Sequence, residues 1–410
     1  MKLTKEAKKA IMIGTLCSVS YFAVYIARNI MGAVSPGMIE SGLFTEESIG
    51  TISSTYFVFY AVGQLINGAI GDRVKARWMI SIGLFMAGIM NLIFSRIAGV
   101  SALAPFVYGM TGFFLAMIYG PMTKSVAENT EPIYATRCSL GFTFASFVGS
   151  PMAGVLATFM VWQSVYAFSG VALCVMAIAA FTVFFIFEKK GLIRYGQFRV
   201  EKKAEGGAVG SLWDKIKLLW HHRILKFTLI SVLTGIVRTS VTFWLSTYIS
   251  QQLGFTPKAA ASIFTAATFI ISMTAFISVF VYERLKRNMD LTILVMFSSS
   301  ATFFALVFLV HQPVLNMIFM VLAIMSSNGA ATMLWSRYCP SLRDTGMVSG
   351  VTGFLAFMSY MGAASANLLF ANAVSVIGWG NLILVWFGLM VVGVIIALPY
   401  SKFKRKTLQK

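Results

Sequence analysis

The sequence alternates between apolar runs of about 20 residues and short segments that hold most of the charged positions. A run of this length matches the hydrocarbon thickness of a lipid bilayer. Because water is absent there, the backbone must form its hydrogen bonds within its own segment, which favours helix. The pattern therefore predicts twelve membrane-spanning helices. The predicted spans are 11–38, 48–70, 78–95, 103–123, 139–160, 163–187, 225–250, 259–281, 290–310, 313–335, 347–371 and 378–400.

The composition supports an all-α membrane protein over a soluble one. Hydrophobic residues make up 58% of the 410 positions and charged residues only 11%, with a mean hydropathy of +0.80. A soluble domain carries about 25% charged residues. The four cysteines have no paired spacing and the three histidines match no metal-ligand pattern, so we expect neither a metal nor another cofactor.

The basic residues predict the orientation of the chain. If both termini are cytoplasmic, 29 of the 33 lysines and arginines fall in cytoplasmic segments, two fall outside and two within spans. This bias predicts a multi-pass protein of the cytoplasmic membrane with both termini inside. The net charge of +19 then reflects basic loops that face anionic lipid headgroups, and it implies no nucleic-acid partner.

The spans divide into two six-helix halves. Residues 1–187 form the first half, 188–223 a long basic cytoplasmic loop, and 224–410 the second half. Within the loop, 213–220 is either an amphipathic helix on the membrane surface or part of a solvated linker. We expect the protein to act as a monomer.

Two arginines interrupt the apolar spans. A charged side chain at the bilayer centre costs about 2.5–3.5 kcal/mol on insertion scales, so such residues usually serve a function. Arg28 lies in span 1 and Arg238 in span 7, the equivalent helix of the second half. Arg28 precedes Asp72 by 44 residues and Arg238 precedes Glu283 by 45, which places the two arginines at matching depths.

No acidic residue is predicted at that depth, because all 14 aspartates and glutamates fall in termini, loops or span ends. Two unpaired guanidinium groups in a water-filled cavity predict a small anionic ligand, since the planar fork suits phosphate, sulfonate or carboxylate. The alternative for Arg238 is that its side chain extends to the membrane interface.

Neutral hydrogen-bonding residues surround the two arginines in the predicted helices. For each residue taken singly, helix packing is the favoured alternative, except for Gln64, whose amide needs partners. The candidate substrate-binding residues are Arg28, Arg238, Tyr21, Tyr25, Tyr60, Gln64, Thr234, Thr242, Ser146 and Tyr360. Of these, Ser146 and Tyr360 are weaker candidates, as are Ser139, Thr143, Asn328 and Asn367.

The loop after span 2 carries a recognisable motif. The segment from Gly68 through Asp72 and Arg73 to Arg77 resembles the loop motif of the major facilitator superfamily, and Glu283-Arg284 after span 8 resembles a degraded copy. The resemblance implies a charged cytoplasmic gate at these residues. It also implies two pseudo-symmetric six-helix halves with the substrate site near the midplane between them.

Spans 1 and 7 resemble a narrower family, the organophosphate:phosphate antiporters. The resemblance rests on Tyr21 to Asn29 and on Gly235 to Tyr248, and it implies that Arg28 and Arg238 clamp a phosphate group. The chain departs from that family at Gln64, where a lysine is common, and at Ser146, near the place of a histidine.

Together these features predict a secondary transporter that moves an organophosphate, such as a sugar phosphate or glycerol phosphate, by alternating access in exchange for inorganic phosphate. The alternatives are a carboxylate or sulfonate transporter working by uniport or proton coupling, and an anion receptor that does not transport. We do not expect an enzyme, because no His, Asp, Glu or Cys constellation lies at membrane depth.

Overall fold

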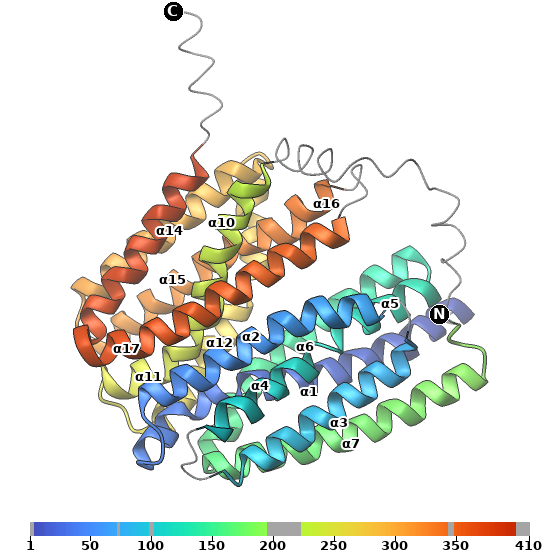
Figure 1. Ribbon diagram of the computed structural model, residues 1–410. Coiled ribbons are helices and arrows are strands. Elements are labelled where there is room, and N and C mark those ends of the chain that lie inside the picture. Colours follow the sequence, from blue (N-terminus) through green and yellow to red (C-terminus); the bar gives the residue numbers. More distant parts are fainter. Residues whose placement is uncertain (1–3, 72–73, 98–101, 195–222, 343–347, 399–410) are drawn as a thin grey trace, which may run out of the picture.

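The computed structural model describes residues 4–71, 74–97, 102–194, 223–342 and 348–398. Every regular element in these ranges is helical, which confirms the predicted all-α fold class. Figure 1 shows two groups of helices, one from each half of the chain, that meet at one end and diverge toward the other.

The first group is built from the N-terminal part of the chain. Its first helix begins after Thr4, whose hydroxyl accepts a hydrogen bond from the Ala7 N–H at 3.2 Å and so caps the helix. The helices are α1 (Lys5–Glu40), α2 (Glu46–Gly71), α3 (Ala76–Phe94), α4 (Leu103–Leu115), α5 (Tyr119–Asn129), α6 (Pro132–Phe159) and α7 (Trp162–Lys189).

The second group contains two π-helical segments, η2 and η3, inside long helices. Several of its helices begin with side-chain caps, such as Thr256 before α12 and Asn288 before α14. The elements are α10 (Ile224–Gly235), η2 (Ile236–Val241), α11 (Thr242–Gln251), α12 (Pro257–Ser272), α13 (Thr274–Arg284), α14 (Met289–Leu309), α15 (Pro313–Met333), η3 (Leu334–Tyr338), α16 (Cys339–Ser341) and α17 (Val348–Ala397).

The lengths of these helices suit a bilayer. Within the described ranges, 10 helical stretches are long and apolar enough to cross a membrane, and α6 carries a shorter apolar stretch, Phe144–Phe159. The stretch Val351–Ala397 has 47 residues and is interrupted at Gly378. The φ of Gly378 is 72°, a left-handed value that glycine adopts without strain. One span needs only about 20 residues, so α17 has length for two. The count of twelve stays a prediction.

Two predicted spans are broken helices in the structure. Span 4, expected to run unbroken over 103–123, divides into α4 and α5 just before Pro121, which has no N–H to donate to the carbonyl of Met117. Span 8 divides at Met273, whose N–H bonds the carbonyl of Ile270 at 3.0 Å in a tightened turn. The hydrophobic pattern does not reveal such breaks, because both sides of each break remain apolar.

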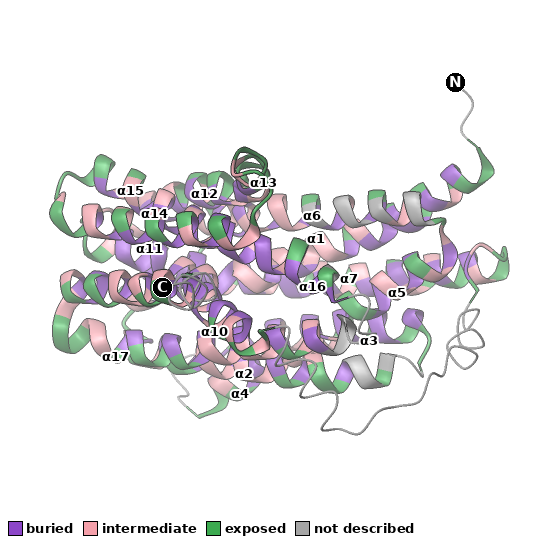
Figure 2. Cartoon of the chain, turned by 90° about the horizontal axis from the view of Figure 1, so that it is seen from above, coloured by how far each residue is buried: buried purple, intermediate pink, exposed green. Residues whose placement is uncertain are grey.

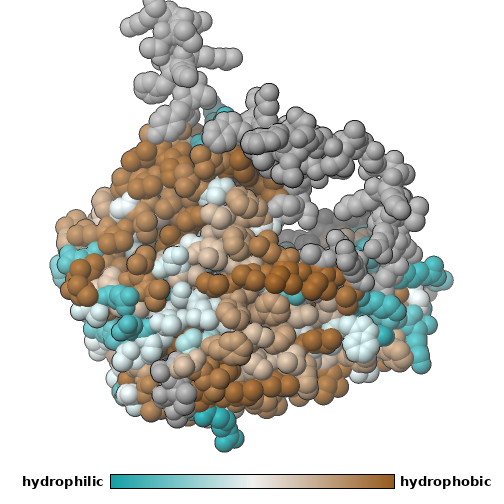
Figure 3. All heavy atoms as spheres, viewed as in Figure 1, coloured by the Kyte–Doolittle hydropathy of each residue, from teal (hydrophilic) through white to brown (hydrophobic). Residues whose placement is uncertain are grey.

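The outer surface of the molecule is apolar. Figure 3 shows hydrophobic residues over most of the surface visible in that view, and buried and exposed residues alternate along the helices in Figure 2. Exposed residues such as Phe168, Ile178 and Val385 belong to this surface. An apolar surface of this extent suits lipid rather than water.

The two halves of the chain are in contact toward one of the two faces at which the helices end. We call the face that carries the start of α1 and the end of α17 the terminal face, and the other the distal face. Hydrogen bonds join the halves toward the distal face: Ser35 Oγ lies 2.8 Å from Thr247 Oγ1, and Gln251 Nε2 donates to Glu46 Oε1 at 2.6 Å. At Gly32, a Cβ atom would lie 3.0 Å from the carbonyl oxygen of Phe243, so the two backbones approach closely.

Candidate functional site

A cavity of about 960 Å³ lies between the two halves. Its wall comes chiefly from α1 and α6 of the first half and from η2, α11, α12, α13 and α15 of the second. No aspartate or glutamate lines it in the part of the chain that the structure describes. The hydroxyl, amide and guanidinium residues of the wall are Tyr25, Arg28, Asn29, Ser146, Ser150, Arg238, Thr239, Thr242, Thr268, Ser272, Thr274, Asn328 and Thr332.

Arg28 is held by tyrosines. Its guanidinium carbon lies 5.7, 4.9 and 5.1 Å from the ring centroids of Tyr25, Tyr60 and Tyr360, within cation–π range. Its Nη1 donates to the hydroxyl of Tyr60 at 3.4 Å and its Nη2 to that of Tyr360 at 3.0 Å. These partners fix the side chain but bring no formal negative charge, so the positive charge of Arg28 remains available to an anion.

Tyr360 links the two arginines. It belongs to α17 in the second half, so its bond to Arg28 crosses from one half to the other. Tyr360 also lies within electrostatic range of Arg238. Arg28 and Arg238 therefore lie near the same tyrosine, on opposite walls of the cavity.

Arg238 sits in the π-helical segment η2. Its half-buried side chain lines the cavity and forms no hydrogen bond or ion pair with any residue that the structure describes. π-helical turns are uncommon and occur frequently at functional sites, because they turn one side chain away from the regular register. Since Arg238 lines the cavity, its position differs from that of a side chain extended to the membrane interface.

The remaining predicted residues divide into two sets. Tyr25, Thr242 and Ser146 line the cavity, and the hydroxyl oxygen of Thr242 is buried with no hydrogen-bond partner among the described residues. That oxygen is free to bond a ligand.

The second set stands behind the wall. The ring centroids of Tyr21 and Tyr25 lie 5.0 Å apart. Gln64 lies beside Tyr60 and does not line the cavity. Thr234 is buried and donates to the Ile230 carbonyl of its own helix at 2.8 Å. The structure therefore places these side chains in supporting positions.

The structure adds residues that the sequence did not predict for the site. Asn29 donates to the Tyr25 carbonyl at 2.7 Å and to the Ser150 hydroxyl at 3.1 Å, which joins α1 to α6 beside Arg28. Thr332 and Trp335 also line the cavity. Asn328, a weaker candidate from the sequence, lies there too, and its side-chain oxygen is buried without a partner among the described residues. In the sequence, the spacing of positions 328, 332 and 335 could have indicated that they line one site, because these positions share one helical face.

The predicted gate motif is described only in part. Gly68 falls within α2, while Asp72 and Arg73 lie outside the described residues. Arg77 donates to Glu188 Oε2 at 2.9 Å, which joins α3 to α7 within the first half. Its guanidinium group also lies 5.0 Å from the Phe181 ring.

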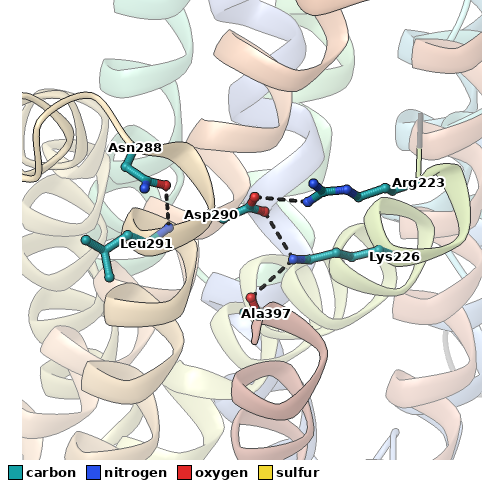
Figure 4. Close-up of polar contacts among 6 residues, drawn as sticks. All are labelled: Arg223, Lys226, Asn288, Asp290, Leu291 and Ala397. Atoms are coloured by element: carbon teal, nitrogen blue, oxygen red, sulfur yellow. Dashed lines mark hydrogen bonds and ion pairs between the residues drawn. The ribbon is translucent and has the colours of Figure 1, made fainter. Parts of the chain in front are cut away.

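The predicted gate residues of the second half lie at the end of α13. Glu283 and Arg284 are exposed, and neither forms an ion pair with another described residue. Asp290, at the start of α14, instead accepts from Arg223 at 3.0 Å and from Lys226 at 3.1 Å (Figure 4). Asp290 lies seven positions beyond Glu283, after the turn.

Lys226 extends this cluster to the end of the chain's last described helix. Its ammonium group donates to the carbonyl of Ala397 at 3.1 Å, and Figure 4 shows it between that carbonyl and Asp290. Three helices, α10, α14 and α17, are thereby joined at the terminal face.

Comparison with known proteins assigns the family. A sequence profile of the Major Facilitator Superfamily matches residues 17–367, a range that includes both arginines and Tyr360. The chain belongs to the Major Facilitator Superfamily. The wide match agrees with the arrangement of two helical groups around a central cavity.

Individual relatives refine this assignment. The glycerol-3-phosphate transporter of Bacillus subtilis is 21% identical over 423 residues, covering 98% of this chain and 94% of that protein. The membrane sensor protein UhpC of Salmonella typhimurium is 24% identical over 274 residues, which are 62% of this chain and 61% of that protein. The predicted resemblance to the organophosphate:phosphate antiporters is confirmed by these relatives.

Solved structures share the architecture. The crystal structure of a D-xylose-proton symporter superposes with a TM-score of 0.75 at 10% sequence identity, over 95% of this chain and 97% of that one. At this identity the likeness establishes the fold alone. The protein is therefore a multi-pass membrane protein of the major facilitator fold.

Proposed function

We propose that this protein is a secondary active transporter of the cytoplasmic membrane that moves a small organophosphate by alternating access. The observation that carries the proposal is the placement of Arg28 and Arg238 in one cavity, one from each half, with no carboxylate among the described lining residues. The names of the relatives, a glycerol-3-phosphate transporter among them, support a phosphate ester as the ligand.

The site is suited to a phosphate group. Arg28 is oriented by Tyr60 and Tyr360, so little side-chain freedom is lost when it binds. Arg238 and the Thr242 hydroxyl approach from the other wall. A phosphate dianion between them would accept charge-assisted hydrogen bonds, which are about twice as strong as neutral ones.

The positions of the contacts between the halves support alternating access. The described polar contacts of the terminal face, Arg77 with Glu188 and Asp290 with Lys226, stay within one half, whereas Ser35–Thr247 joins the halves toward the distal face. With both termini inside the cell, this arrangement corresponds to an inward-facing state. The bound anion drives closure only if it binds the closed form more tightly, which two arginines on opposite walls allow.

Exchange with inorganic phosphate has the same physical origin. Without an anion, closing the cavity brings two uncompensated guanidinium groups into a dry site, which is unfavourable. A returning phosphate removes this penalty. The empty carrier is therefore expected to close more slowly than the loaded one.

Phosphate exchange in proteoliposomes tests this function. Wild-type protein should take up radiolabelled phosphate when unlabelled phosphate is inside. Arg28→Lys and Arg238→Lys should each remove most of the uptake, because an ammonium group lacks the planar fork of guanidinium. Arg96→Lys, at an exposed arginine outside the cavity, is the matched control and should exchange like wild type.

Two results would contradict the proposal. One is wild-type exchange by either cavity variant. The other is tight phosphate binding without any exchange, which would indicate a receptor; one relative is named a membrane sensor protein.

A further inference from the structure

One part of the cavity wall carries large apolar side chains, and the hydroxyls of Ser272 and Thr274 beside them donate to the carbonyls of Thr268 and Ile271 at 2.8 and 2.6 Å. The large apolar side chains are Phe144 and Phe147 of α6 and Phe269, Met273 and Phe276 along α12 and α13. Positions 269, 273 and 276 all line the cavity, at and on either side of the break at Met273. We call these five apolar side chains the aromatic wall.

The seam between α6 and the helix pair α12–α13 is closed at its distal end. The rings of Phe147 and Phe269 meet with centroids 5.0 Å apart, and the hydroxyls of Thr158 and Ser262 lie 3.3 Å apart further on. At the other end, Phe144 is 66% exposed and Phe276 is 68% exposed although both line the cavity. No ring contact joins these two across the seam in the described part of the chain, so this end of the seam lacks the ring packing seen between Phe147 and Phe269.

Polar side chains surround Arg28 in the same cavity. Asn29, beside Arg28, bonds Ser150 on α6. Ser150 and Phe144 are six positions apart, which corresponds to roughly 9 Å along a helix. Along α6, the cavity wall therefore changes from a polar residue beside Arg28 to an aromatic one within about two turns.

This division suits a particular kind of organophosphate. The hydroxyl groups of a sugar phosphate would meet phenylalanine rings over that distance and would lose hydrogen bonds to water without replacement. An alkyl or aryl group would instead remove apolar surface from water.

We propose that the ligand is an amphiphilic phosphate monoester whose phosphate binds Arg28 and Arg238 while its apolar group lies against the aromatic wall and reaches the lipid through the seam. This inference rests on the proposed function, because it places the phosphate on the same two arginines. It goes further in naming the chemistry of the rest of the molecule.

A series of n-alkyl phosphates tests the inference, with ethyl, butyl and hexyl phosphate as competitors of radiolabelled phosphate exchange in proteoliposomes. Each methylene that reaches the aromatic wall should strengthen inhibition by roughly fourfold. Phe144→Ala and Phe276→Ala should reduce this dependence on chain length while phosphate exchange itself continues. Phe168→Ala is the matched control, because Phe168 is exposed on α7 and does not line the cavity.

The outcomes separate the two proposals. Inhibition independent of chain length, with phosphate exchange intact, would overturn this inference and leave the proposed function in place. A chain-length dependence that both phenylalanine variants retain, or equal inhibition by hexanol, would also overturn it, because the effect would then arise from the bilayer. Absence of phosphate exchange in the wild type would overturn the proposed function and this inference with it.

Discussion

The close approach of α1 and α11 at Gly32 offers a direct test of alternating access. A Cβ atom at Gly32 would lie 3.0 Å from the Phe243 carbonyl oxygen and 3.3 Å from its Cα, both backbone atoms of the other half. Valine adds three carbons at this point. Overpacking of this kind costs about 1–3 kcal/mol. The strain exists only while the distal face is closed, so Gly32→Val should favour the state in which the halves separate there.

The size of the expected shift follows from that cost. A change of about 1–3 kcal/mol multiplies the ratio of distal-open to distal-closed molecules by roughly 5 to 140. A minor state populated at about 1% would then become readily detectable. Because one of the two states is disfavoured, phosphate exchange should slow at the same time.

Electron–electron double resonance measures this ratio. Spin labels at Leu43→Cys and Lys258→Cys place one probe on each half near the distal face, at exposed positions. Gly32→Val should increase the long-distance population. Gly37→Val is the matched control on the same helix, because a Cβ there meets nothing within 4 Å. An unchanged distance distribution in a folded Gly32→Val protein would refute the reasoning.

Three further changes have defined outcomes. Tyr360→Phe keeps the ring but removes the hydroxyl that accepts from Arg28 at 3.0 Å, so phosphate exchange should fall by about tenfold, the effect of one hydrogen bond to a charged group; a variant as active as wild type would contradict this. Asp290→Asn removes the acid that binds Arg223 and Lys226 and should lower the Tm in thermal unfolding, whereas Glu283→Gln, at an exposed acid with no ion pair among the described residues, should not; equal Tm values would show that the cluster stabilises nothing. Arg77→Gln removes the ion pair between Arg77 and Glu188, whose side chains are largely buried, so we expect a clearly reduced Tm; a Tm equal to that of wild type would contradict this.

Much of the fold could be predicted because lipid imposes a simple rule. Long apolar runs must be helices there, so the hydropathy pattern alone indicated where most helices lie. The breaks before Pro121 and at Met273, and the π-helical turn at Arg238, could not be located in the same way. They depend on how neighbouring helices pack, and the apolar pattern continues through them.

The residues of the site, like the helices, could be predicted only in part from the sequence. Arg28 and Arg238 were identifiable because a charge within an apolar run is costly and needs a purpose. The role of Thr234 was not readable, because helical spacing shows which residues share a face but not which neighbour that face meets. In the structure the next residue, Gly235, lies against the backbone of Ser359, so this stretch packs on α17.

The partners of the acidic residues at the terminal face could not be predicted from the sequence. Sequence resemblance placed the second gate at Glu283, directly after span 8. The acid that binds two basic side chains is Asp290, on the other side of the turn. Because a short turn brings residues on both of its sides to the same surface, the position of an acid in sequence does not identify its partners.

The central claim is that Arg28 and Arg238 form a single anion site. Titration calorimetry of the purified protein with phenyl phosphate tests it most directly, using Arg28→Gln, Arg238→Gln and the double variant. The account predicts that each single variant loses most of the binding free energy and that the double variant is hardly worse than either, because both groups hold one phosphate. Wild-type affinity in either single variant, or fully additive losses in the double variant, would contradict it.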